Sequence, residues 1–293
     1  IVFGDWSSDV CSSDLAGGDF RLVLNPDIRL LPGAITALTD AATSTGATLT
    51  GPRYYWDDQL TFRFSPATGH SLWLRTGMEM AERYRPDSAL VDFTTDAMFQ
   101  RHWQAQEPFA EPFLNGACLL IRNDPALFPA AKIFDEQFFM YFEDTDLSLR
   151  MLLRGDYPVC APGATAIHYW NQSPSGQKSQ MMADSEKVFI RKYYPQEVPF
   201  VNGPSLTPTG IRNLGTFHDP PEFVTDTMQS GNKLYLDVGV NHYFKPFARS
   251  HFKGHSFRFP PEIWEKLSSG TYFTRIYEAR LCHTLNIFKW EKA

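Results

Sequence analysis

The stretch DFRLVLNPDIRLLPGAITALTDAATSTGATLTG, residues 19–51, decides the fold class of this chain. Its apolar beginning predicts a strand over residues 19–24, which ends at a turn-forming Asn-Pro-Asp. A Pro-Gly pair then opens an amphipathic helix that ends near Gly46, and residues 47–51 predict the next strand. A strand, a helix and a strand in this order indicate an α/β layer with parallel pairing.

Further elements follow this unit along the chain. Residues 51–75 are polar and aromatic and contain Pro and Gly, so they predict a long loop. Strands are expected over residues 117–121 and 164–170. Helices are expected over residues 144–154 and 178–194, and the first of these should be buried because its apolar residues surround it almost completely.

The composition changes after the second of these helices. Residues 195–221 are rich in Pro, Gly, Asn and Thr, which marks a linker. Beyond it, alternating apolar and polar segments separated by Gly and Pro predict a small antiparallel β-sandwich of about 85 to 90 residues. We therefore divide the chain into residues 16–202, an α/β domain, and residues 203–293, an all-β accessory domain.

The overall composition excludes several classes of protein. No apolar run approaches the roughly 18 residues that span a bilayer, so no transmembrane segment is expected. The formal net charge is −6, and the Lys and Arg residues are scattered singly. This pattern offers no basic surface for a phosphate backbone, so nucleic acid is not expected as a partner.

The N-terminal segment has an unusual sequence. Residues 5–15, DWSSDVCSSDL, match the translation of one frame of a common sequencing-adapter oligonucleotide. We interpret residues 1–15 as non-native and leave them out of fold reasoning, the alternative being a natural Ser/Asp-rich tail. The remaining Cys118, Cys160 and Cys282 are far apart and lack metal-site spacing. They favour a reducing compartment, hence the cytoplasm.

Two polar residues stand where predicted strands end, which is where open α/β sheets bind ligands. Asp27 follows the first strand, and its carboxylate suits a hard cation that also holds a diphosphate. Asn-Pro-Asp is equally an ordinary turn. His168 lies near the end of a later strand, where a lone histidine is usually structural and needs Asp27 nearby to act as a metal ligand.

Other candidates precede the buried helix or lie in the long predicted loop. Glu143 and Asp144 can cap the backbone amides of that helix, or one of them can accept a proton from a sugar hydroxyl. Arg53, Tyr55 and Trp56 can stack on or hydrogen-bond to a sugar, although packing in a core explains them equally well.

Four motifs in their order resemble those of a known family. LNPDIRLLPGAI, FLNGACLLIRND, FDEQFFMYFEDTDLSLRMLLRG and AIHYW with its Ser-containing loop are similar to bacterial family 2 glycosyltransferases, particularly the rhamnosyltransferase-like branch. The resemblance covers residues 19 to about 195. It implies the GT-A fold, here an incomplete Rossmann-like mixed sheet flanked by helices, and inverting transfer from a nucleotide-diphospho-sugar to a glycan or lipid-linked acceptor in cell-surface polysaccharide synthesis.

The resemblance also implies roles for individual residues. Asp27 and His168 would bind Mg or Mn, which neutralises the departing nucleoside diphosphate. Asp144 would be the base that deprotonates the acceptor, and Glu143 would support it. The substrate-binding residues would be Asn25, Arg53, Trp56, Asn115, Gly116 and Trp170. Such an enzyme would work in the cytoplasm, with peripheral association at the inner face of the membrane.

Two departures from the family pattern bear on activity. Asn25 stands where many relatives carry an acid, so metal affinity is expected to be weaker or the metal dispensable. The family's first strands and helices should precede Asp19, and two βαβ-sized pieces would need roughly 60 residues. We therefore expect this chain to be an inactive fragment of a transferase.

A competing interpretation is a non-catalytic carbohydrate-binding or scaffold protein with a degenerate transferase core. A glycoside hydrolase is less favoured, because its paired carboxylates across a cleft cannot be identified from spacing.

Overall fold

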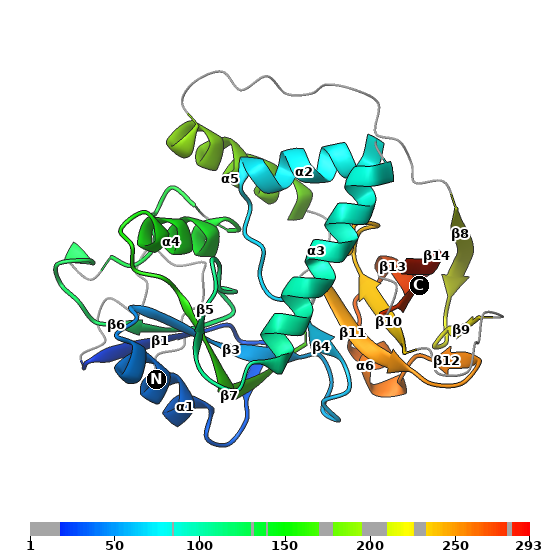
Figure 1. Cartoon of the computed structure of the whole chain (residues 1–293), viewed down its shortest axis with the longest axis horizontal. Coiled ribbons are helices and arrows are strands. Elements are labelled where there is room, and N and C mark those ends of the chain that lie inside the picture. The colour runs from blue at the N-terminus through cyan, green and yellow to red at the C-terminus, as the bar shows by residue number, and fades with distance from the viewer. Residues whose placement is uncertain are drawn as a thin grey trace.

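The computed structural model describes residues 18–83, 85–129, 132–138, 140–169, 178–194, 210–225, 233–279 and 283–293. It is an α/β structure in which helices flank a large mixed sheet (Figure 1). The segment that we interpret as non-native, residues 1–15, lies outside the described residues.

The helices are α1 (Ala34–Thr45), α2 (Leu72–Arg83), α3 (Arg85–Gln104), α4 (Glu143–Leu152), α5 (Lys178–Tyr193) and α6 (Pro261–Lys266). The strands are β1 (Phe20–Leu24), β2 (Ile28–Leu30), β3 (Leu49–Tyr55), β4 (Arg63–Phe64), β5 (Phe109–Ala110), β6 (Cys118–Arg122), β7 (Val159–His168), β8 (Ile211–Phe217), β9 (Glu222–Val224), β10 (Leu234–Gly239), β11 (Phe247–Phe252), β12 (Ser256–Arg258), β13 (Gly270–Glu278) and β14 (His283–Lys292). Among the described residues, no helix has the length and apolarity needed to cross a bilayer.

The predicted helix after the first strand is confirmed as α1. Gly33 and Gly46 flank it with φ of 84° and 75°, so each lies in the left-handed region that glycine adopts without strain. The helix buries Leu38 and its small neighbours against β7. Removing a leucine side chain from water in this way contributes about 1.5–3 kcal/mol to stability.

The predicted pairing of the first two strands is wrong. β6 lies between β1 and β3 and is antiparallel to both. The parallel partner of β3 is β7, with Thr50 opposite Val159 and Tyr55 opposite Ile167. A strand far along the chain therefore occupies the place beside β3, and a strand–helix–strand pattern alone cannot reveal it.

The long loop predicted over residues 51–75 is confirmed only in part, over residues 56–62 and 65–71. Residues 51–55 form the second half of β3, where the strand is buried on both faces. β4 follows after a turn in which the Asp57 carboxylate accepts hydrogen bonds from the amides of Thr61 and Phe62. The segment 65–71 then leads into α2, and neither α2 nor α3 was predicted.

Helix α4 is confirmed, and its apolar residues serve two clusters. Leu147 and Met151 are buried in one cluster with β6, whereas Leu149 packs on the other side against Phe142 and Phe189. Leu153, just beyond the helix, is exposed. The nearly continuous apolar surface of this helix therefore reflects its position between two cores.

The expected C-terminal β-sandwich is not confirmed. β11 pairs with β4, with Ala248 opposite Phe64, so the C-terminal strands extend the same sheet as β3 and β6. The parallel pair β14–β8 and helix α6 also depart from an antiparallel, all-β arrangement. The main apolar core runs across both parts, from Leu38 through Trp56 to Trp290.

A buried ionic network fastens α3 to the C-terminal strands. Arg249 binds Asp237 with Nε–Oδ1 at 2.6 Å and also pairs with Asp96 of α3. Arg275 binds the same Asp237 at 2.8 Å and Asp92 of α3 at 2.8 Å. Burial by itself raises the pKa of Asp237, but the charges and hydrogen bonds of the two arginines outweigh it and lower that pKa.

Candidate functional site

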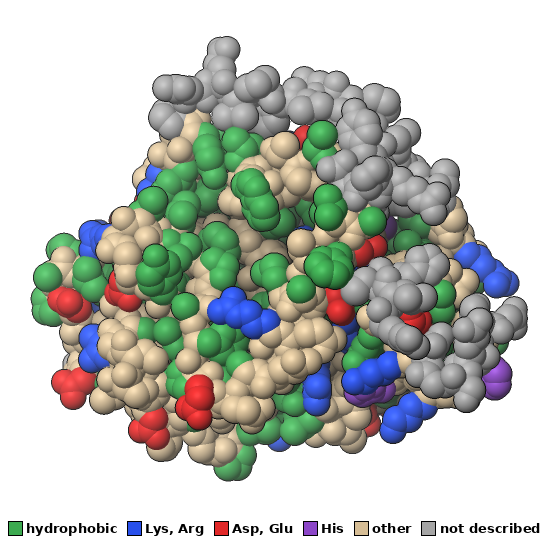
Figure 2. Space-filling model, viewed as in Figure 1, with side chains coloured by type: hydrophobic (Ala, Val, Ile, Leu, Met, Phe, Trp, Pro, Cys, Tyr) green, Lys and Arg blue, Asp and Glu red, His purple; other side chains and the backbone are tan. Residues whose placement is uncertain are grey.

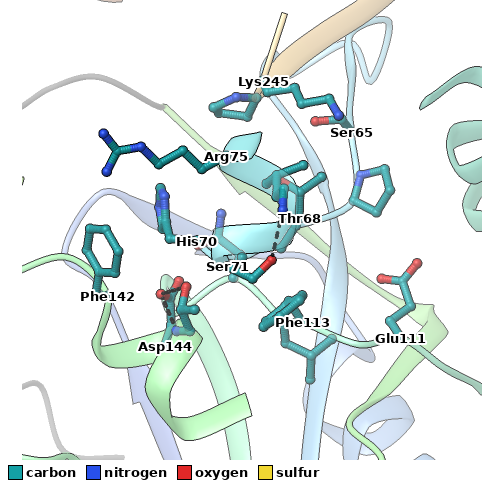
Figure 3. A pocket seen from close by; sticks show the side chains of 18 of the residues that line it. Ser65, Thr68, His70, Ser71, Arg75, Glu111, Phe113, Phe142, Asp144 and Lys245 are labelled. Carbon is teal, nitrogen blue, oxygen red and sulfur yellow. Dashed lines mark hydrogen bonds between the residues drawn. The ribbon is translucent and has the colours of Figure 1, made fainter. Parts of the chain in front are cut away.

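A cavity of about 560 Å³ lies between the first sheet strands and the C-terminal part. Its wall comes from β3 and β4, the segment 65–71, helix α2, the segment 111–115, the start of α4, helix α5 and the turn 243–246. The volume falls in the range of roughly 300–1,000 Å³ that is typical of small-molecule sites. Figure 3 shows its polar residues, with Asp144 at one end and Lys245 at the other.

Asp144 of α4 is held on this wall by backbone amides. Gly116 donates its N–H to Oδ2 at 3.0 Å, and Thr145 donates to Oδ1 at 2.6 Å. A Cβ at position 116 would lie 3.0 Å from the Asp144 Cβ, so only glycine permits this approach. Gly116 therefore orients the carboxylate, and Asp144 partly caps its own helix while facing the cavity.

Glu143 lies beside Asp144 but does not line the cavity. Burial and the neighbouring Asp144 charge raise the pKa of Glu143 to about 8. Its Oε2 is buried and has no hydrogen-bond partner among the described residues. At neutral pH Glu143 is therefore mostly protonated, which spares Asp144 a second negative charge at close range.

His70 is a cavity residue that sequence reasoning missed. Its ring lies 4.4 Å from the Phe142 ring, centroid to centroid, and faces the same space as Asp144 (Figure 3). Burial lowers the pKa of His70, while Asp144 and Glu186 partly oppose that effect. The only sequence signal was a single histidine in a segment taken as a loop.

The two predicted metal ligands lie together. His168 Nε2 is 3.3 Å from Asp27 Oδ2, because β2 pairs with the end of β7. Burial raises the pKa of Asp27, but its hydrogen bond with His168 and the charge of that ring outweigh this and lower it overall. His168 also lines the cavity.

This pair fits a divalent cation. Asp27 Oδ1 is buried and has no hydrogen-bond partner among the described residues. The Asp27 Oδ1 atom is a ligand that Mg and Mn accept, and His168 Nε2 would join it on giving up its hydrogen bond to Asp27 Oδ2. The Asn-Pro-Asp stretch thus forms a turn and also presents a free ligand atom.

The other predicted binding residues differ in where they lie relative to the cavity. Asn115 lines the cavity, and its Oδ1 accepts the Ala117 amide at 2.9 Å. Asn25 follows β1, and its amide donates to the Ala117 carbonyl at 2.9 Å, but Asn25 is not part of the cavity wall. Trp170 lies outside the described residues.

Arg53 and Trp56 are core residues, so the sugar contacts expected of them find no support. Arg53 is buried in β3 and donates to the carbonyls of His102 and Ala105, the second at 2.7 Å. Trp56 is 2% exposed and packs edge-on against Phe62. Both had been assigned to a loop, whereas Arg53 lies in β3 and Trp56 follows directly after it.

A second cluster of possible ligand atoms lies at the cavity wall, which includes His102 and Glu111. One atom each of His102, Glu111 and Cys160 lies within 4.8 Å of the others, and all three residues are buried. His102 Nδ1 and Glu111 Oε1 already form a hydrogen bond of 2.8 Å. The positive charge of Arg53 also acts on Glu111 and Cys160. This cluster is better explained as a buried His–Glu pair that supports the wall.

No protein-family model matches the chain. The chain is similar to the N-acetylglucosaminyl-diphospho-decaprenol L-rhamnosyltransferases of two Mycobacterium tuberculosis strains, CDC 1551 / Oshkosh and ATCC 25618 / H37Rv. It is 31% identical to each over 170 residues, which make up 58% of this chain and 53% of each relative. The chain is related to glycosyltransferases. It spans about half the length of the curated relatives that it matches.

Proposed function

We propose that this chain belongs to an inverting family 2 glycosyltransferase of the GT-A type. It would move a sugar from a nucleotide-diphospho-sugar to a hydroxyl of a glycan or lipid-linked acceptor. The observation that carries the proposal is the amide-held carboxylate of Asp144 in a ligand-sized cavity that also contains His168, the partner of Asp27. The order of the four sequence motifs and the similarity to the rhamnosyltransferases support it.

In the proposed reaction, Asp144 acts as the base. Its carboxylate takes the proton of the acceptor hydroxyl while that oxygen attacks the anomeric carbon from the side opposite the leaving group. The bond from that carbon to the diphosphate oxygen breaks, and the nucleoside diphosphate leaves with the electron pair. Protonated Glu143 keeps the local charge low, and the Gly116 amide fixes the attacking geometry.

Asp27 and His168 would hold Mg or Mn, which supplies charge neutralisation for the departing diphosphate. Their position at the sheet edge, with His168 on the cavity wall, brings the donor phosphates and Asp144 to one space. We place this reaction in the cytoplasm, at the inner face of the membrane, where a nucleotide sugar can meet a lipid-linked acceptor.

The test is sugar transfer by this chain with a nucleotide-diphospho-rhamnose donor and an N-acetylglucosaminyl-diphospho-lipid acceptor. Transfer at a measurable rate would also show that the expectation of an inactive fragment is wrong. Asp144→Asn should lower the transfer rate by roughly 10²–10⁴-fold, as expected when a general base is lost. Asp184→Asn is a matched control, since Asp184 is an exposed aspartate of α5 outside the cavity. Glycan binding that persists unchanged in Asp27→Ala and Asp144→Asn, without transfer by the unmodified chain, would favour the non-catalytic binding protein instead.

A further inference from the structure

The cavity contains two cations, which differ in their partners. Arg75 of α2 pairs with Glu79 at 3.1 Å and with Glu186 of α5 at 2.6 Å. Lys245 forms no ion pair with a described residue. Burial lowers the pKa of Lys245, and the charge of Asp92 only partly opposes this effect. Lys245 is therefore the cation on this wall that is available to an anionic ligand.

The backbone around Lys245 is firmly held. The Lys245 backbone N–H donates a hydrogen bond to Asn241 Oδ1 at 3.2 Å. The Asn241 side-chain amide donates a second one to the Lys245 carbonyl at 2.7 Å. Two residues further on, the Phe247 amide donates to Ser65 Oγ at 3.2 Å. The Ser65 hydroxyl keeps its hydrogen, and it lies next to Lys245 on the cavity wall (Figure 3). An ammonium and a hydroxyl donor in one place suit a phosphate group.

Helices α2 and α3, which contribute to the cavity wall, carry exposed apolar side chains. Trp73 of α2 is 84% exposed and lies between Leu72 and Leu74, which both line the cavity. In α3, Asp92 lies between the exposed Leu90 and Phe93. Hydrophobic side chains also gather on the visible face over α2 and α5 (Figure 2). A ligand with a phosphate at Lys245 could therefore leave the cavity along the exposed apolar side chains of α2 and α3.

We propose that Lys245, assisted by the Ser65 hydroxyl, binds the diphosphate of a lipid-linked acceptor whose chain exits over α2 and α3. This inference rests on the proposed function and adds an acceptor subsite that comes from the C-terminal part of the chain. A donor diphosphate has the same chemistry, but its place is already provided by Asp27 and His168. The exposed apolar side chains favour a lipid diphosphate over a nucleoside diphosphate, because they can contact a hydrocarbon chain but offer no hydrogen bonds to a nucleoside.

The experiment is calorimetric titration with geranyl diphosphate, geraniol, and uridine or thymidine diphosphate in the presence of Mn. The variants are Lys245→Met, Lys245→Arg and the control Lys253→Met, an exposed lysine outside the cavity. We expect Lys245→Met to weaken geranyl diphosphate binding about tenfold, as for a lost charged hydrogen bond. Lys245→Arg should restore most of it, and Lys253→Met should change nothing. Geraniol and nucleoside diphosphate binding should not respond to position 245.

Two results would overturn the inference: no binding of geranyl diphosphate to the unmodified chain, or equal binding by Lys245→Met. A loss of nucleoside diphosphate binding in Lys245→Met would show that Lys245 binds the donor diphosphate, and this result would also refute the inference. Failure of the proposed function has a separate readout in the transfer assay: Asp144→Asn would then transfer sugar at the rate of the unmodified chain. The lipid diphosphate could then still bind through Lys245.

Discussion

Gly116 and Asp144 are in contact across the cavity wall: the glycine amide donates to the carboxylate at 3.0 Å, and its missing side chain leaves room for the Asp144 Cβ. The two residues belong to different elements, the turn before β6 and the first turn of α4. The position of the proposed base therefore depends on the packing of α4 against β6.

Gly116→Ala should disturb this contact. The added Cβ would lie 3.0 Å from the Asp144 Cβ, so the carboxylate must shift by a few tenths of an ångström or more. We expect a loss of transfer rate of roughly 10–100-fold, since small displacements of a catalytic group are costly. Gly77→Ala is the matched control, because Gly77 is exposed in α2 and an added Cβ meets nothing within 4 Å. Transfer at the unmodified rate by Gly116→Ala would contradict the role given to this pair.

Removal of a metal ligand should act on donor binding. Asp27→Ala takes away the carboxylate next to His168, so Mn should no longer strengthen the binding of a nucleoside diphosphate. Calorimetric titration of the nucleotide with Mn and with a chelator measures this difference. Asp40→Asn, a change of an exposed aspartate in α1, should keep the response to Mn. If Asp27→Ala also keeps it, these two residues do not hold the metal.

Glu143 should make stability depend on pH. Its pKa is raised from an ordinary 4.5 to about 8 in the folded chain, so the folded state binds a proton that the unfolded state releases. This contribution to stability is complete below about pH 4.5 and is lost as the pH rises through 8.

The isosteric change Glu143→Gln removes the titration. The stability of the unmodified chain relative to Glu143→Gln should therefore fall between pH 5 and pH 8.5. Urea unfolding of both proteins at the two pH values measures the difference. A difference in free energy of unfolding that is the same at both pH values would show that Glu143 does not titrate in this range.

The buried network on α3 should be critical for folding. Asp237→Ala would leave the Arg249 and Arg275 guanidiniums without their shared carboxylate in a buried environment. We expect a loss of about 3–5 kcal/mol in the free energy of unfolding. Glu136→Gln, which breaks an exposed pair with Lys132, should stay within about 0.5 kcal/mol. Thermal and urea unfolding measure both changes, and similar losses for the two variants would argue against the network.

Local patterns predicted local structure well. The helix beginning at Ala34, the strand at Cys118 and the helix at Glu143 each have a clear local pattern of apolar residues, so all three were predicted. The proximity of Asp27 and His168 was also expected, because the family resemblance implies that both bind one ion.

Features that depend on distant partners were not predicted. The sequence GPRYY in β3 contains Gly and Pro and has no alternation, since β6, β7 and β4 all pair with this strand and bury it. Arg53 in β3 and Trp56 directly after it are therefore both buried in the core. His70 lines the cavity together with Asp144 of α4, which is far from it in sequence. Lys245 lines the same cavity but belongs to the C-terminal part, which was expected to be a separate domain.

The pairing of β4 with β11 affects how the chain folds during synthesis. Phe64 bonds to a strand that the ribosome makes ~180 residues later, and at roughly 5–20 residues per second this interval lasts roughly 10–40 s. Until then one edge of β4 is open, and an open edge invites pairing with other chains. The cavity wall formed by the turn 243–246 is also absent during this time. The cavity wall is therefore complete only after residues 243–246 have been synthesised.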